Sequence, residues 1–334
     1  MSCKPTLAFA ILLAVANPCI DALAAGPATA TTSESAAALA QLPTGPRKRI
    51  SIAKFDANGA FVTVYGSWDI GGGLAAQLTT ALVESGRFIV VERPDLAVVL
   101  REQELAKLNV TSKDSGPQAG KVLGTQLIVH GSVTEFEQNS TGRNTNLGVS
   151  GNAGAAMNML GAAVAKSTTN GIVGVDVRLI DATTSQVLQS KRIEKRLSTS
   201  DTSINLAASQ VAFGTEQFDK SVLGQATRAA IEEAVVFIAT FAAKLPWTGA
   251  LADVDGSNVL INAGSGAGLA IGDRFAVLVV AKEVTDPTTG QSLGRIERQS
   301  GTVRITSVEP AFSTAVMEQP FAATRGDTVR WVGR

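Results

Sequence analysis

Few side chains in this sequence could carry out enzyme chemistry. His130 is the only histidine, and the two cysteines, Cys3 and Cys19, both lie near the N-terminus. One histidine cannot form the multi-ligand set of a zinc site, and no nucleophile–base pair or closely spaced carboxylate pair stands out. We therefore expect a protein that is not an enzyme, with no catalytic residue, metal or cofactor. We expect His130 to be a packed or surface residue of a strand.

Two glycine-rich stretches resemble phosphate-binding loops only superficially. Gly71–Gly73 is not part of a Gly-x-Gly-x-x-Gly pattern, and no Gly-Lys-Ser/Thr follows it. Gly264–Gly268 is not followed by a helical pattern. We interpret the first as a flexible entry to a helix and the second as no nucleotide site.

The composition excludes some partners and sets the number of domains. Lys and Arg together number 29, as do Asp and Glu, so the net charge is zero. A balanced chain lacks the basic footprint of a nucleic-acid-binding protein, so we expect no nucleic acid partner. A length of 334 residues with 45% hydrophobic content predicts two domains with ample cores.

The N-terminal residues predict export. Lys4 precedes the apolar run Leu7–Ala16, and Ala22–Ala24 supplies small residues for a signal peptidase. We predict a signal peptide over residues 1–24 and a periplasmic mature chain, with an uncleaved anchor as the alternative. The residues before Cys19 do not form a lipobox, so a lipoprotein is not expected. The mature chain then contains no cysteine and forms no disulfide.

The remaining pattern predicts an α+β fold that begins with an α/β domain over residues 47–245. Residues 25–46, rich in Ala, Thr, Ser and Pro, predict a flexible linker, and Arg47–Arg49 predicts a solvated strand entry. Leu96, Val99, Leu100 and Leu108 predict the apolar face of a helix that Pro94 opens. The expected strands are Ile50–Phe55, Phe88–Val91, Gln126–Phe136, Val173–Ile180 and Val187–Leu197, and the other expected helices are Ile70–Arg87 and Val222–Leu245.

Residues 247–334 predict a second, small all-β domain. Pro246 ends the last helix, and helical periodicity does not return. Short strands alternate with Gly-Asp turns, and Asp286–Gly290 predicts a hairpin turn. The expected fold is an SH3-like barrel. Its expected strands are Val259–Ile261, Phe275–Val280, Thr302–Val308 and Thr328–Trp331.

Several sequence segments resemble the curli production assembly/transport component family, the CsgG-like proteins that include holdfast-anchoring relatives. The resemblance covers roughly residues 48–245, and the tail around Gly268–Asp273 resembles the C-terminal module of flagellar assembly protein T. The segments that carry the first resemblance are Ala81–Phe88 with Val91–Arg93, Val129–Phe136, Val175–Asp181 and Phe218–Ile231.

The resemblance implies an oligomeric ring at the outer membrane, in which each subunit contributes two β-hairpins to a shared pore. It also implies a channel constriction formed by a loop before the first helix of the domain. Phe61, Tyr65 and Trp68 occupy the corresponding stretch here. The alternative is that these three side chains pack as hydrophobic anchors under a loop.

Residues 145–159 alternate in the manner of a membrane or oligomer strand, and so does the returning strand Val173–Leu179. Three features oppose a lipid-facing pair: residues 143–180 contain no aromatic residue, residues 153–165 also suit an amphipathic helix, and the stretch 191–196 places charge on both faces of its strand. A short second hairpin over about 197–215 remains open. The proposed apolar strand face consists of Leu147, Val149, Ala153, Ala155, Met157 and Met159.

Two functions fit these observations. The first is an exported, outer-membrane-associated homo-oligomer that supports secretion or anchoring of surface fibres or adhesins, whose subunits would be its partners. The second is a periplasmic accessory module without a pore, which tethers or activates another envelope protein through its barrel domain.

Overall fold

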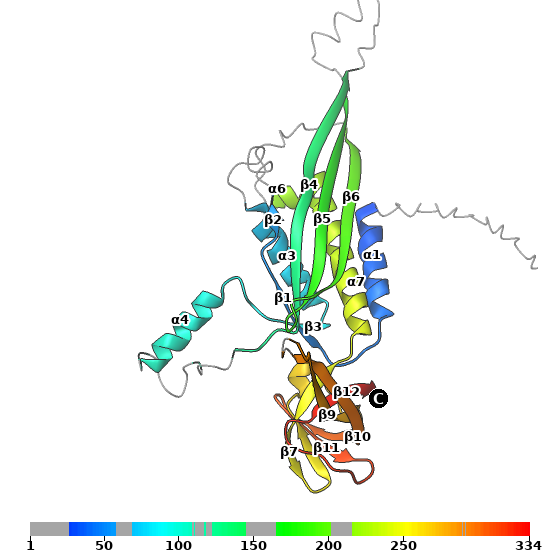
Figure 1. The fold of residues 1–334 in the computed structure, drawn as a ribbon. Helices are drawn as coiled ribbons and strands as arrows, with labels where there is room; N and C mark the ends of the chain where they lie inside the picture. Colours follow the sequence, from blue (N-terminus) through cyan, green and yellow to red (C-terminus); the bar gives the residue numbers. More distant parts are fainter. Residues whose placement is uncertain are drawn as a thin grey trace, which may run out of the picture.

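The computed structural model of the chain describes residues 27–57, 69–108, 110, 117, 122–144, 165–201, 216–288, 290 and 292–334. It shows a mixed α+β fold with two parts. An open sheet with helices forms the N-terminal part, and a closed barrel forms the C-terminal part (Figure 1).

The open sheet has six strands and joins a parallel half to an antiparallel half. Its order is β3-β1-β4-β5-β6, and β2 pairs with β4 off this path. The pairs among β3, β1 and β4 are parallel, whereas β4, β5 and β6 form an antiparallel meander. The strand bounds are β1 Lys48–Ile52, β2 Asp56–Ala57, β3 Phe88–Val90, β4 Leu127–Asn144, β5 Ala165–Asp181 and β6 Val187–Asp201.

Local sequence signals set the ends of the two helices that cover the sheet. The Asp69 carboxylate accepts a hydrogen bond from the Gly72 amide at 2.9 Å and caps the first of them, α3. Ser221 caps the second, α7, in the same way, through the Gly224 amide at 3.0 Å. Pro246 cannot continue α7, and the residue before it is already extended. The helices are α1 Pro27–Ala40, α3 Ile70–Glu84, α4 Leu96–Lys107, α6 Glu216–Lys220 and α7 Val222–Lys244.

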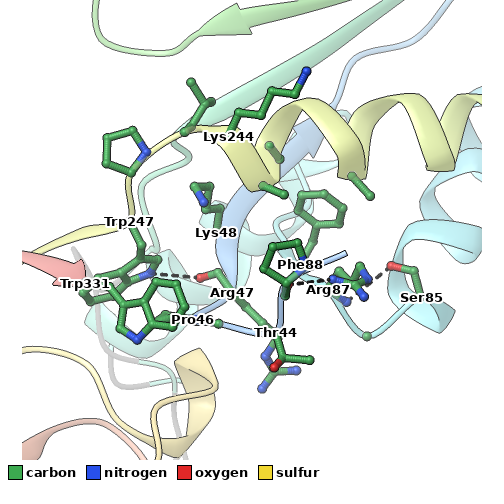
Figure 2. Close-up of a pocket in the computed structure, with 18 residues that line it drawn as sticks. Thr44, Pro46, Arg47, Lys48, Ser85, Arg87, Phe88, Lys244, Trp247 and Trp331 are labelled. Atoms are coloured by element: carbon green, nitrogen blue, oxygen red, sulfur yellow. Dashed lines mark hydrogen bonds between the residues drawn. The ribbon is translucent and has the colours of Figure 1, made fainter. Parts of the chain in front are cut away.

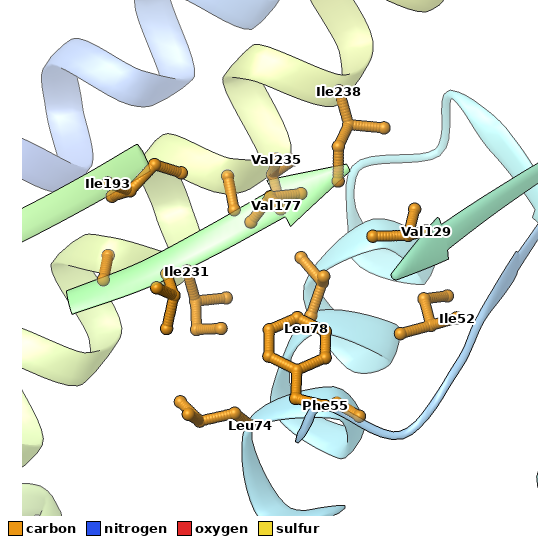
Figure 3. Packing of buried hydrophobic residues seen from close by; sticks show 14 of the residues in the cluster. Ile52, Phe55, Leu74, Leu78, Val129, Val177, Ile193, Ile231, Val235 and Ile238 are labelled. Atoms are coloured by element: carbon orange, nitrogen blue, oxygen red, sulfur yellow. The ribbon is translucent and has the colours of Figure 1, made fainter. Parts of the chain in front are cut away.

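One hydrophobic core lies between the sheet and helices α3 and α7. Alternate residues of β5, Val173, Val175, Val177 and Leu179, are all fully buried. Ile238 of α7 is also fully buried in this cluster. Figure 3 shows the packing, with side chains of α3 and α7 meeting those of the strands.

Gly71, in the first turn of α3, is required by close packing. A Cβ on this residue would lie 2.0 Å from the carbonyl oxygen of Phe55, where no side chain fits. The sequence predicted a flexible helix entry for the three glycines, but this one brings the helix against the chain that follows β1.

The predicted linker over residues 25–46 is wrong for most of its length, because α1 occupies Pro27–Ala40. Its alanines favour a helix, and Leu39 and Leu42 pack against the core. The Arg87 guanidinium also donates to the carbonyl oxygens of Leu39, Leu42 and Pro43, so it caps the end of this helix.

The C-terminal part is a closed six-stranded barrel with the order β10-β11-β8-β7-β12-β9. The predicted turn joins β9 to β10, with the Gly290 amide donating to the Asp286 carbonyl oxygen at 2.8 Å. Four strands match the sequence prediction, whereas β7 and β11 were not predicted. The bounds are β7 Thr248–Asp255, β8 Asn258–Ile261, β9 Arg274–Thr285, β10 Ser292–Val308, β11 Ser313–Met317 and β12 Thr328–Gly333.

The barrel has a hydrophobic core of its own. Trp247 lies in it, with its ring centroid 5.6 Å from that of Phe275 in an edge-to-face arrangement. Val277, Val303 and Val329 are fully buried around them. Two separate cores are compatible with the predicted division near residue 246, and independent folding of the two parts stays a prediction.

Candidate functional site

Strands β4, β5 and β6 extend well beyond the helices that cover their base (Figure 1). They contain 18, 17 and 15 residues, about three times the usual strand length. Pairing continues to the far ends, where Asn144 lies opposite Ala165, and Ser167 lies opposite Asp201. The three strands therefore form a ribbon whose far end lies away from the core.

Both sets of site residues predicted from the sequence lie outside the described part of the chain. Phe61, Tyr65 and Trp68 belong to residues 58–68, and the strand face from Leu147 to Met159 belongs to residues 145–164. The constriction and the membrane or oligomer face therefore stay predictions.

The interpretation of Val173–Leu179 as a lipid-facing strand is wrong. Every second residue of this stretch is fully buried beneath α7 in the domain core. The alternation that suggested lipid is the same for any strand with one buried face, so it could not distinguish the two environments.

The charged stretch of β6 is neutralised within the subunit. Lys191 and Lys195 both contact Glu233 of α7, at 2.7 and 2.6 Å, and Arg192 contacts Glu135 at 3.2 Å. Burial of Glu233 opposes its ionisation, but hydrogen bonds from the two lysines outweigh this effect and lower its pKa. These charges belong to the base of the ribbon, where the two lysines attach β6 to α7 and Arg192 contacts β4.

The residues along the outer strand β6 change from charged to uncharged toward its far end. β6 is the last strand in the sheet order, so only β5 pairs with it among the described strands. In residues 191–196 every residue but Ile193 is charged, which is a common device against edge pairing. The following residues, Leu197–Ser200, carry no charge. Only the upper part of this edge is thus suited to accept another strand.

Helix α4 exposes apolar side chains instead of burying them. It lies apart from both the sheet and the barrel (Figure 1). Val99, Leu100 and Leu108 of the predicted apolar face are 39%, 49% and 68% exposed, and the neighbouring Val98 is 69% exposed. The only buried residue of the helix is Gln103. The predicted apolar face is therefore not part of this subunit's core, and such a surface commonly marks a contact site.

The N-terminal part and the barrel are joined by hydrogen bonds around Arg47. Its amide donates to the Ala267 carbonyl oxygen at 2.7 Å, and its guanidinium donates to that of Gly266 at 2.9 Å. The Trp247 indole donates to the Arg47 carbonyl oxygen at 3.3 Å. The predicted solvated strand entry is therefore wrong for Arg47, because this residue joins the two parts.

A cavity of about 540 Å³ opens beside this junction. Figure 2 shows its lining, which comes from the chain before β1, the turn between α3 and β3, the end of α7, and the barrel residues Trp247 and Trp331. Lys48 reaches into this region between the end of α7 and the segment that carries Arg47. Burial lowers the pKa of the Lys48 ammonium to about 8.

Metal ligation and helical membrane insertion find no support in the described ranges. No group of three or more His, Cys, Asp or Glu residues is placed to hold a metal ion. His130 lies on β4 with its Nε2 3.6 Å from a carboxylate oxygen of the exposed Asp56. Across the same ranges, no helix combines the length and hydropathy needed to span a bilayer.

Comparison with protein families gives a match over residues 31–259, more than half of the chain, to the family described as curli production assembly/transport component CsgG. The chain belongs to the CsgG family. The match begins within α1 and includes β4–β6 and α7, so the resemblance to the CsgG-like proteins is confirmed, whereas that of the tail stays a prediction. A search of curated proteins gave no match.

Solved structures similar to this CsgG-family chain share little sequence with it. A hypothetical protein CT253 from Chlamydia trachomatis has 10% identity and a TM-score of 0.36, covering 58% of this chain and 97% of its own. A PelC dodecamer from Paraburkholderia phytofirmans has 14% identity and a TM-score of 0.27, covering 59% and 91%. A putative lipoprotein from Caulobacter crescentus has 15% identity and a TM-score of 0.26, covering 63% and 93%.

Proposed function

We propose that this CsgG-family protein is an exported envelope component that assembles side by side with copies of itself and supports secretion or anchoring of surface fibres or adhesins. Membership of the family supports an envelope secretion or assembly role. The observation that carries the proposal is the ribbon β4–β6, which extends past the helices. Its last strand has an uncharged stretch, Leu197–Ser200, along an edge with which no other described strand pairs.

Edge pairing explains why the ribbon is long. A strand that ends in water with an unpaired edge leaves its outer backbone groups to solvent, whereas a neighbouring subunit would pair with them. The charged base of β6 restricts such pairing to Leu197–Ser200, just before Asp201 at the end of the strand. Copies therefore join at the upper end of the ribbon, and the N-terminal parts stand side by side beneath.

Helix α4 provides a second contact in this assembly. Its exposed Val98 and Leu100 need an apolar surface that the described part of their own subunit does not offer, and a neighbouring copy of the chain supplies it. Burial of such residues in a subunit contact contributes roughly 25 cal/mol for each Å² of apolar surface.

The accessory role without a pore is the second candidate. It is favoured by the polar sequence Asn139–Asn144 at the end of β4, which shows no lipid-facing alternation. In this version the barrel, which we infer to be of the SH3-like type, contacts another envelope protein. The partners then include that protein, and the ribbon need not enter the outer membrane.

Size-exclusion chromatography with light scattering, on a detergent extract of the envelope, distinguishes the two candidates. A large species in the outer-membrane fraction supports the assembled form, whereas a monomer or dimer released without detergent supports the accessory module. N-terminal sequencing of the same material tests export, because a chain that begins at Met1 in the cytoplasm contradicts both candidates.

Substitutions in residues 145–159 test whether this segment forms the apolar contact. Val149→Arg and Met157→Arg place charges on the proposed apolar face, and each should weaken assembly by roughly 2–4 kcal/mol if that face meets lipid or a neighbouring subunit. Asn146→Asp and Asn152→Asp, on the opposite face, are the matched controls and should be tolerated. Equal tolerance of both pairs contradicts the pore and leaves the accessory role.

A further inference from the structure

We infer that the cavity between the N-terminal part and the barrel binds a small organic anion, in which a phosphate or carboxylate is attached to an apolar ring. The anionic group lies beside Lys48, and the ring lies along Trp247 and Trp331. This site does not depend on the assembly proposed above, because all its residues come from one subunit.

The charged side chains around the cavity indicate that its ligand is an anion. The Arg47 and Arg87 guanidinium groups are engaged by backbone carbonyl oxygens. Lys48, in contrast, has neither an ion pair nor a hydrogen bond to its side chain in the described part of the chain. Lys244 lies exposed at the rim. None of the described lining residues is acidic, so the cavity offers a cation without its counterion.

An unpaired ammonium in a half-buried position is costly. Burial is the cause of the lowered pKa of Lys48, and no described residue of the subunit pairs with its charge. A bound anion would both pair with this group and raise its pKa again. The site is therefore complete only when a negatively charged group occupies it.

The apolar part of the lining favours a ligand that has an apolar ring attached to its anionic group. Trp247 and Trp331 line the cavity together with proline rings, Phe88 and alanine methyl groups of α7, so slightly more than half of the wall is apolar (Figure 2). A volume of about 540 Å³ lies in the range of small-molecule sites. An inorganic ion would fill a small part of this space and leave the aromatic wall in contact with water.

Tryptophan fluorescence of the full chain tests the site directly, because two of the three tryptophans line the cavity. The probe is phenyl phosphate, with inorganic phosphate and benzyl alcohol as controls that each carry one half of its chemistry. We expect saturable binding of phenyl phosphate, at least about tenfold tighter than either control. No saturable signal, or equal binding of inorganic phosphate, overturns the proposal.

The variant Lys48→Met removes the charge and keeps the length of the side chain. It should weaken phenyl phosphate binding at least about tenfold and leave benzyl alcohol binding unchanged. Lys107→Met, which removes an exposed charge on α4, should bind as the parent does. Equal phenyl phosphate affinity in the Lys48 variant overturns the assignment of the anion to this residue.

The pH profile of the unmodified protein gives a readout that does not depend on any variant. Lys48 loses its proton as pH rises through about 8, whereas the probe stays a dianion above its second pKa of about 6. Affinity should therefore fall about tenfold from pH 7 to pH 9, and a flat profile overturns the proposal.

Discussion

Helices α7 and α4 are both rich in apolar residues, but only α7 belongs to the core of this subunit. Thirteen of its 23 residues are buried, whereas one of the 12 residues of α4 is buried. α7 places small residues such as Ala226 and Ala230 against the sheet, which lets the helix approach closely. In α4, by contrast, Val98, Val99 and Leu100 remain exposed. Apolar content therefore does not decide which helix a subunit buries.

The same substitution in both helices gives the largest expected difference. Leu223→Ala, in α7, removes a buried side chain that is 4% exposed, and should lower the free energy of unfolding by about 2–5 kcal/mol. Leu100→Ala, in α4, removes a half-exposed side chain and should change it by no more than about 0.5 kcal/mol. Urea unfolding of the dissociated subunit measures both values. Similar losses at the two positions would place α4 in the core after all.

Regular patterns predicted the elements of the N-terminal part well. Strands β4 and β5 and helix α7 follow from periodicity, because each has one buried face and one polar face. β6 was also predicted, although Ile193 is the one residue buried among its described side chains. The environment of a face could not be predicted in this way. β5 has the alternation expected of a lipid-facing strand yet lies in the core, and α4 has a helical apolar pattern yet remains exposed.

The cavity could not be predicted because its residues are far apart in the sequence. Lys48, the turn at Arg87, the end of α7 and Trp331 come together only through the placement of the barrel against the N-terminal part. The sequence of the three basic residues Arg47–Arg49 does not indicate that their side chains lie in different environments. In the structure the first contacts the barrel and the second lies in the cavity.

Charge on α4 tests whether its exposure serves assembly. Leu100→Glu places a carboxylate in the proposed contact between copies, and should weaken association by about 2 kcal/mol, roughly a thirtyfold rise in the dissociation constant. The matched control is Ile296→Glu on the barrel, because Ile296 is 53% exposed, close to the 49% of Leu100. Light scattering across a concentration series measures the shift.

The thermal stability of the dissociated subunit should be unchanged by either substitution, since neither side chain is buried in it. If Ile296→Glu weakens association as much as Leu100→Glu, the barrel contributes to the contact and α4 has no special role. If neither variant changes association, copies do not meet through α4. The helix would then be exposed without forming a contact between subunits.

The smallest expected effect concerns the ion pairs that attach α7 to the sheet and that α4 lacks. Glu233→Gln removes the partner of Lys191 and Lys195, and should cost about 1 kcal/mol at neutral pH because the three groups remain partly exposed. Glu104→Gln on α4 is the matched control. Glu104 has no ion pair within the described ranges, so its replacement should cost nothing measurable.

The pH dependence gives this last prediction its sign. The pKa of Glu233 is lower in the folded protein than its ordinary value of 4.5. The stabilisation is therefore complete above the pKa of the unfolded chain and is lost as pH falls through the folded value. The difference in unfolding free energy between the parent and Glu233→Gln should be constant from pH 7 down to about 5 and then shrink. A difference that persists unchanged below pH 3 would mean that Glu233 stabilises α7 by packing, and that the two helices differ in apolar burial alone.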